Sequence, residues 1–173
     1  DSGWIQAYAE NAQESLDFAL MSYYIAEHKT VSTPFMVNLD GFVLTHTYET
    51  VDVPSEKQAD EYLPPYDTEN RLDLDNPKNL AFSAGPEHNY IFKYKEHKAM
   101  LNAVKVIGEA EERFERIFGR HYTGLVEKYR TDDADYISVA KQALSAAERI
   151  GFEELFSEHK SSWRKYWAKS FVN

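Results

Sequence analysis

Cysteine is absent from the 173 residues of the sequence. Disulfide bonds are therefore excluded, and so is any iron–sulfur cluster ligated by this chain, because thiolates hold those clusters. Basic residues are also few, with 19 lysines and arginines against 29 aspartates and glutamates and a net charge of −10. This acidic balance argues against nucleic acid as a partner, because phosphate binding needs a clustered basic surface.

Long apolar runs are missing as well. No stretch of the sequence approaches the roughly 18 apolar residues that a membrane-spanning helix needs, so we expect no membrane partner. The first residues also lack the basic and apolar regions of a signal peptide, which favours a cytoplasmic location. The sequence starts at Asp1 and enters directly into Gly3-Trp4-Ile5. We therefore expect a piece of a longer protein.

Several motifs with defined chemistry are absent. The sequence has no Gly-x-Ser-x-Gly elbow, no P-loop and no Gly-x-Gly-x-x-Gly, which leaves no argument for a hydrolase nucleophile or a phosphate cradle. The six histidines include no pair at four-residue spacing, so we predict no metal site in this chain.

The residues that are present predict an α/β fold. Hydrophobic residues make up 43% of the chain, enough for the core of about one domain. Trp4 to Ala9 can form a strand, and Asn11 with Glu14 fits a helix N-terminus. We expect that helix to run to about Glu27 and Phe35 to Leu39 to be a buried strand, a β-α-β start. The expected buried stripe of the helix is Ala12, Leu16, Ala19, Leu20, Tyr23 and Tyr24.

Asp40-Gly41 follows the second strand, at the sheet end where α/β proteins place ligands. Phe42 to Glu49 alternates like a further strand, which Pro54 ends. The candidate wall or contact residues are Asp40, Gly41, His46, Thr47 and Tyr48. From the pattern alone, a half-buried strand histidine without a catalytic role is the favoured interpretation of His46.

The remaining elements follow from caps and periodicity. Ser55 and Gln58 predict a short helix that Pro64-Pro65 ends, and 64–86 reads as a long connection. A long helix is expected from about His88 to Phe118, with Gly119 as its stop. Its expected apolar face is Met100, Val104, Ile107, Phe114 and Phe118, and Lys93, Lys95 and Lys98 form a basic cluster diluted by Glu87 and Glu96. Strands are expected at 125–129 and 136–140, and a helical pattern at 141–171.

Five separated blocks resemble the alpha portion of the pyruvate:ferredoxin (2-oxoacid:ferredoxin) oxidoreductases, and they occur in that family's order. The blocks are "DSGWIQAYAENAQESLDFAL", "MVNLDGFVLTHTYETVDVP", "ADEYLPPY", "YKEHKAMLNAVKVI" and "FGRHYTGLVEKYRTDDADY". The resemblance covers about residues 1–140. It implies the second half of the domain that binds the aminopyrimidine of thiamine diphosphate, with residues 1–130 as this partial domain and 131–140 as the passage to the next one.

The resemblance implies oxidative decarboxylation of a 2-oxo acid to an acyl-CoA, with thiamine diphosphate and Mg²⁺ as cofactors and iron–sulfur clusters in other subunits or domains. The implied partners are those subunits or domains, with ferredoxin and coenzyme A acting through the assembly. The family's activating glutamate and substrate arginine are expected upstream of Asp1, and its Gly-Asp-Gly diphosphate motif elsewhere. The isolated chain is therefore expected to be inactive.

After Ala140 the sequence departs from the family pattern. We expect 141–173 to be a helical tail of different origin, and "GFEELFSEHKSSWRKYWAKSFV" faintly resembles a helical linker of bacterial glycoside hydrolases. Packing of an amphipathic helix is the favoured explanation of its aromatic residues. Two alternatives to the oxidoreductase subunit stay open here: a non-catalytic structural or chimeric helical-rich protein, and a linker fragment of a carbohydrate enzyme.

Overall fold

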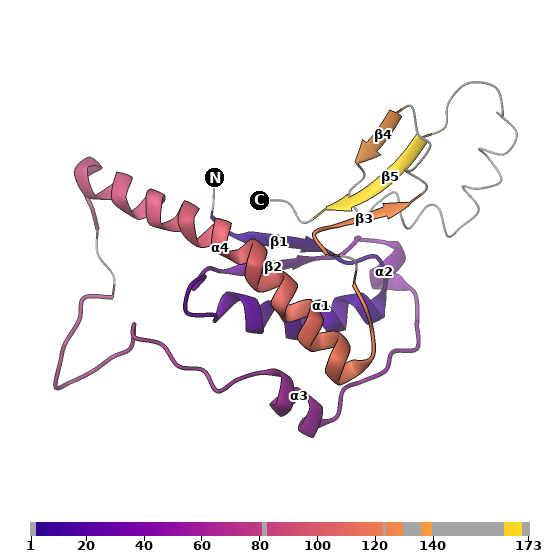
Figure 1. The fold of residues 1–173 in the computed structure, drawn as a ribbon, viewed down its shortest axis with the longest axis horizontal. Helices are drawn as coiled ribbons and strands as arrows, with labels where there is room; N and C mark the ends of the chain where they lie inside the picture. Colours follow the sequence, from indigo (N-terminus) through magenta and orange to yellow (C-terminus); the bar gives the residue numbers. More distant parts are fainter. Residues whose placement is uncertain (1–2, 81–82, 123, 130–135, 140–164, 171–173) are drawn as a thin grey trace, which may run out of the picture.

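The computed structural model describes residues 3–80, 83–122, 124–129, 136–139 and 165–170. It begins with the predicted β-α-β unit: β1 (Ile5–Tyr8), α1 (Ala12–Ala26) and β2 (Phe35–Asn38) (Figure 1). The two strands are parallel, with Ile5 opposite Phe35 and Tyr8 opposite Asn38. Ile5 and Ala7 are buried while their neighbours are partly exposed, as the period of a strand requires. The α/β class is confirmed.

The start of α1 was correctly predicted, but its buried face was not. The Asn11 side chain accepts a hydrogen bond from the Glu14 amide at 2.7 Å, which caps the helix. The expected stripe is wrong at Ala19 and Tyr23, which are exposed, whereas Leu20 and Tyr24 are partly buried against the core. The side that faces the core also carries two acidic side chains, which apolar periodicity does not register. The buried residues of α1 are Glu14, Asp17, Phe18, Met21 and Ile25.

The long helix α4 (Pro86–Phe118) lies across α1 with its C-terminal half, and its N-terminal half extends past the rest of the fold (Figure 1). Gly119 ends it with φ of 71° and donates its amide to the Glu115 carbonyl at 2.7 Å, as predicted. The expected face is wrong at Val104, which is exposed, because α4 buries the small Ala103 and Ala110 instead. The buried residues of α4 are Ala103, Val106, Ile107, Ala110 and Phe114.

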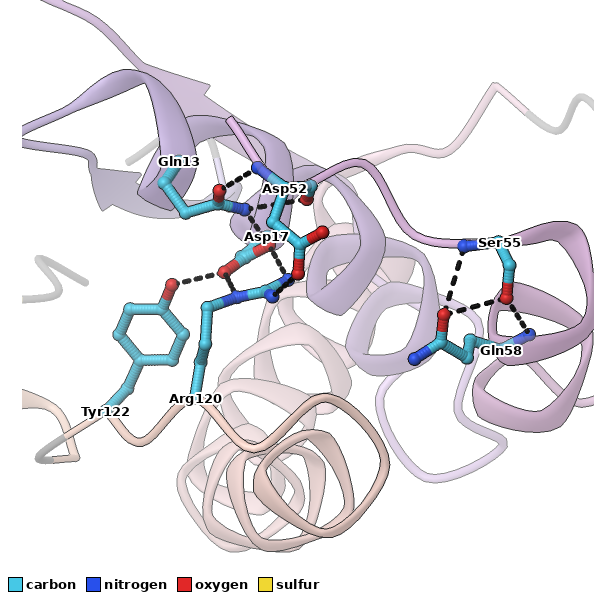
Figure 2. Close-up of polar contacts among 7 residues, drawn as sticks. All are labelled: Gln13, Asp17, Asp52, Ser55, Gln58, Arg120 and Tyr122. Carbon is cyan, nitrogen blue, oxygen red and sulfur yellow. Dashed lines mark hydrogen bonds and ion pairs between the residues drawn. The ribbon is translucent and has the colours of Figure 1, made fainter. Parts of the chain in front are cut away.

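The short helix α3 (Glu56–Tyr62) packs on α4 through Tyr62. Ser55 and Gln58 form the predicted capping box at its start (Figure 2). The Tyr62 side chain is fully buried, and its ring lies 5.3 Å from that of Phe114. Its hydroxyl donates to the Ala110 carbonyl at 3.3 Å, so the buried polar atom has a partner. The core thus lies among the parallel strands, α1, α3 and the C-terminal half of α4.

A second sheet has the order β3-β5-β4. β3 (Val126–Tyr129) and β4 (Tyr136–Val139) are close to the predicted strands. β5 (Lys165–Ser170) lies between them, antiparallel to β3 and parallel to β4. The expected helical tail is therefore wrong at 165–170, where pairing with distant strands overrides the local helical pattern. Residues 141–164 and 171–173 of the expected tail lie outside the described residues. Among the described helices, none is long and apolar enough to cross a membrane.

Candidate functional site

The candidate residues lie on the segment that leaves the C-terminal end of β2. The structure forms a one-turn helix there, α2 (Val43–His46), so the strand predicted for Phe42 to Glu49 is wrong. Asp40 accepts a hydrogen bond from the Val43 amide at 2.8 Å through its carboxylate. The Thr45 hydroxyl donates to the Gly41 carbonyl at 2.6 Å, and that of Thr47 donates to the Val43 carbonyl. These local bonds give the backbone an alternative to a strand ladder.

The aromatic side chains of this turn face solvent. The rings of Phe42 and His46 stack with their centroids 5.7 Å apart, and Phe42 is 81% exposed. His46 is exposed and lies 2.9 Å from the Thr45 hydroxyl through Nδ1. Tyr48 is as exposed as in an open chain, at 105%. The structure thus brings Phe42 and His46 together and leaves Tyr48 apart from any core. His46 is not a half-buried strand residue.

The extended segment that follows α2 is tied to the N-terminal end of α1. The Ala12 amide donates to a Glu49 carboxylate oxygen at 2.9 Å, which places a negative charge at the helix N-terminus. Gln13 makes a two-way contact with the Asp52 backbone: its amide oxygen accepts from the Asp52 N–H at 2.6 Å, and its nitrogen donates to the carbonyl at 3.2 Å. The turn around α2 is therefore fixed at its start by the Asp40 hydrogen bond and at its end by the contacts of Glu49 and Asp52 with α1.

A buried ion pair extends this anchor to the end of α4 (Figure 2). Arg120 donates to both carboxylate oxygens of Asp17, from Nε at 2.6 Å and from Nη2 at 2.8 Å. Its third nitrogen, Nη1, lies 2.9 Å from a carboxylate oxygen of Asp52. The Tyr122 hydroxyl and the Gln13 amide also donate to Asp17, at 2.6 and 3.0 Å. We call Gln13, Asp17, Asp52, Arg120 and Tyr122 the anchor network.

The electrostatics of the anchor network suit a structural role. Asp17 has no exposed surface, and four donors surround its carboxylate, which is the arrangement that makes a buried charge tolerable. The hydrogen bond to Asp17 raises the pKa of Arg120, so the guanidinium stays charged. Burial, followed by the hydrogen bond to Asp17, raises the pKa of Tyr122, which keeps its hydroxyl a donor. Nothing in the sequence signalled this network, because Asp17 and Arg120 are 103 residues apart.

The described residues do not offer a complete cofactor site. In the described ranges, no group of three or more His, Asp or Glu side chains is placed to hold a metal ion. Three carboxylates around this turn make contacts within the fold: Asp40 accepts from the Val43 amide, Glu49 accepts from the Ala12 amide, and Asp17 is buried in the anchor network. No Mg²⁺ ligand and no catalytic step are therefore assigned to these residues.

The fold and this sheet-end turn define an α/β segment of the kind found in cofactor-binding domains. A family model described as "pyruvate flavodoxin/ferredoxin oxidoreductase, thiamine diphosphate-binding" matches residues 1–112, which is more than half of the chain. The chain belongs to this family. The resemblance read from the five sequence blocks is therefore confirmed.

Curated relatives agree with the family match. The chain is 42% identical over 161 residues to pyruvate synthase subunit PorA of Methanothermobacter thermautotrophicus, covering 93% of this chain and 42% of that protein. It is 45% identical over 146 residues to PorA of Pyrococcus abyssi, covering 84% and 37%. Ketoisovalerate oxidoreductase subunit VorA of Pyrococcus horikoshii is 37% identical over 174 residues, covering 99% and 44%.

The chain spans less than half the length of these relatives. The alignments that cover 93% and 99% of the chain also extend past residue 140, into the segment expected to have a different origin. The domain boundaries at 130 and 140, and the contact roles of the five candidate residues, stay predictions.

Proposed function

We propose that the chain is part of the alpha subunit of a 2-oxoacid:ferredoxin oxidoreductase and acts only within the full assembly. The single observation that carries this is the match of residues 1–112 to the thiamine diphosphate-binding family model. The relatives named as pyruvate synthase and ketoisovalerate oxidoreductase subunits support it. They also make the structural, chimeric and carbohydrate-enzyme alternatives unnecessary.

Within this proposal, the reaction is oxidative decarboxylation of a 2-oxo acid to an acyl-CoA. Thiamine diphosphate supplies the carbanion chemistry when it is bound, and the protein supplies placement. The groups that hold its diphosphate and Mg²⁺ come mainly from outside this chain, since the nearby carboxylates serve the fold. Iron–sulfur clusters lie in other subunits or domains, because the chain has no cysteine. Ferredoxin and coenzyme A then meet the assembly rather than this chain alone.

The part assigned to this chain is a wall that meets a neighbouring domain. Phe42, His46 and Tyr48 project from a turn whose backbone is fixed by Asp40 at its start and by the anchor network at its end. Exposed aromatic side chains on a fixed turn are suited to an interface, because little conformational entropy is lost when they are buried. Thr47 bonds the turn itself, so we assign it a supporting role.

Complementation tests the proposal. The isolated chain should give no pyruvate-dependent reduction of an electron acceptor, and adding the missing part of the subunit with its partner subunits should restore turnover. Titration calorimetry with thiamine diphosphate and Mg²⁺ should show heat with the assembly and none with the chain alone. Failure of the chain to join an assembly that is otherwise active would overturn the proposal.

Substitution of His46 separates a wall residue from a catalytic one. In the active assembly, His46→Ala should lower turnover or assembly modestly, whereas loss of a general acid or base costs about 10²- to 10⁴-fold. His28→Ala is the matched control, because His28 follows the C-terminal end of α1, where its Nδ1 contacts Thr30. A collapse of turnover in His46→Ala with the assembly intact would give His46 a catalytic role instead.

A further inference from the structure

The N-terminal half of α4 carries a second apolar face, away from the core. Tyr90, Tyr94, Lys98, Leu101 and Lys105 recur at spacings of three and four, so they share one side of the helix. We call these five residues the outer stripe. The buried residues Ala103, Val106, Ile107 and Ala110 lie on the other side of α4.

The outer stripe is exposed along its length. Tyr90 is 75% exposed and Leu101 is 59% exposed. The Lys98 ammonium lies 5.1 Å from the centre of the Tyr94 ring, which sets a positive charge among the aromatic rings. Residues 86–105 contain four lysines and two glutamates, a net charge of +2 in a chain of −10. Within the stripe the charged residues are Lys98 and Lys105, and the Lys105 ammonium also lies 3.5 Å from a Glu109 carboxylate oxygen on the same helix. The stripe is therefore an apolar surface that carries two lysines.

The connection between α3 and α4 has the complementary character. We call residues 64–80 the arm, which leaves α3, runs outward and returns to the start of α4 (Figure 1). Leu72 and Leu74 on it are 82% and 88% exposed. Residues 66–80 contain four acidic and two basic side chains, a net charge of −2. Irregular connections of this length in a compact domain usually serve a function.

Local contacts give the arm a shape without burying it. Asp73 accepts from the amides of Asp75 and Asn76 at 3.0 and 3.1 Å, and the Lys78 ammonium donates to the Glu69 carbonyl at 2.9 Å. At its start, Asp67 pairs with Lys29 at 2.9 Å. The leucines remain exposed between these points, so the arm presents an apolar, acidic surface.

We propose that the arm of one copy of this chain docks on the outer stripe of α4 in a second copy, so that two copies exchange arms in a dimer. Leu72 and Leu74 then cover Tyr94 and Leu101, while the acidic residues of the arm meet Lys98 and Lys105. Direct pairing of two outer stripes is disfavoured, because it would bring these lysines together. This inference does not depend on the proposed function, because it concerns copies of one chain.

Cross-linking between copies tests the exchange, and the absence of native cysteine makes each introduced thiol unique. Chains carrying Leu74→Cys are mixed with chains carrying Tyr94→Cys and oxidised mildly. Docking holds the two thiols at an effective concentration of order millimolar, so at micromolar protein we expect at least about 10-fold more mixed dimer than with a control pair. The control replaces Tyr94→Cys with Arg116→Cys, which is exposed on the same helix roughly 33 Å further along.

Charge reversal supplies the second arm of the test. Lys98→Glu with Lys105→Glu should remove most of the mixed dimer, and Glu69→Lys with Asp75→Lys in the arm-bearing chain should restore it. Leu72→Ser with Leu74→Ser should convert the dimer to a monomer in light scattering, without a change in the circular dichroism of the fold, since both side chains are exposed. A monomeric wild-type chain would overturn the proposal. Equal cross-linking of the test and control pairs, or a dimer that these changes leave intact, would do so too.

Discussion

Replacing Arg120 with methionine should test whether the anchor network holds the fold together. The change removes the guanidinium and leaves the Asp17 carboxylate with no exposed surface and without its cationic partner. Removing one partner of a buried ion pair costs about 3–5 kcal/mol, because the remaining charge cannot reach water. Domains of this size have about 5–15 kcal/mol of stability in total, so the variant should be close to unfolding.

Urea denaturation followed by circular dichroism measures this cost. With a slope of about 2 kcal/mol per molar urea, the midpoint should fall by about 1.5–2.5 M. The loss should shrink at low pH, where the stranded carboxyl group can take up a proton. Adding Asp17→Asn should recover part of the stability, because an amide carries no charge to strand.

Lys29→Met is the control for Arg120→Met, because it removes an ion pair whose side chains are 75% and 63% exposed. Its midpoint should be unchanged within error, since exposed pairs contribute little. A loss of less than about 1 kcal/mol in Arg120→Met, or single-variant losses that simply add in the double variant, would refute the reasoning.

Two further predictions test other parts of the fold. Gly119→Ala should lower the free energy of unfolding by about 1–2 kcal/mol, because Gly119 has φ of 71°. Gly108→Ala within the same helix should raise it by about 1 kcal/mol, since an added Cβ there meets no atom within 4 Å. Equal thermal midpoints of the two variants would contradict this. Burial raises the pKa of Glu111 to about 7 from an ordinary value of 4.5, so its carboxyl group binds a proton more tightly in the folded state. Stability should therefore fall as pH rises from about 4.5 through 7, and Glu111→Gln should raise the urea midpoint more at pH 8 than at pH 5; a gain independent of pH would exclude this cause.

Local signals in the sequence were enough for most of the elements. The Asn11 cap, the Ser55–Gln58 box and Gly119 mark ends of α1, α3 and α4, because each depends on side chains and backbone within a few residues. The parallel strands followed from short apolar runs on either side of a helix. The family resemblance also depended on the sequence alone, since it rests on the order of five blocks.

The errors arose where the sequence was ambiguous at short range. The alternation of Phe42, Leu44, His46 and Tyr48 is typical of a strand. Asp40 instead accepts a hydrogen bond from the Val43 amide and the Thr45 hydroxyl donates one to the Gly41 carbonyl, and these bonds fold the segment into a helical turn. The search for a buried helix face favoured large apolar residues. It therefore assigned Val104 to the core, where the structure buries the smaller Ala103. At 165–170 the local pattern is helical, and pairing with β3 and β4 decides otherwise.

For the candidate site, too, some features were set by the sequence and others only by the tertiary structure. The sequence by itself determined that the residues around Asp40-Gly41 follow a buried strand and so lie at the end of the sheet, because strand direction fixes that position. Tertiary structure alone decided that Asp17 meets Arg120 and that this pair, with Gln13 and Asp52, fixes the segment behind the candidate turn. Such a pairing depends on how α1 and α4 cross, and no local propensity encodes the angle at which two distant helices pack.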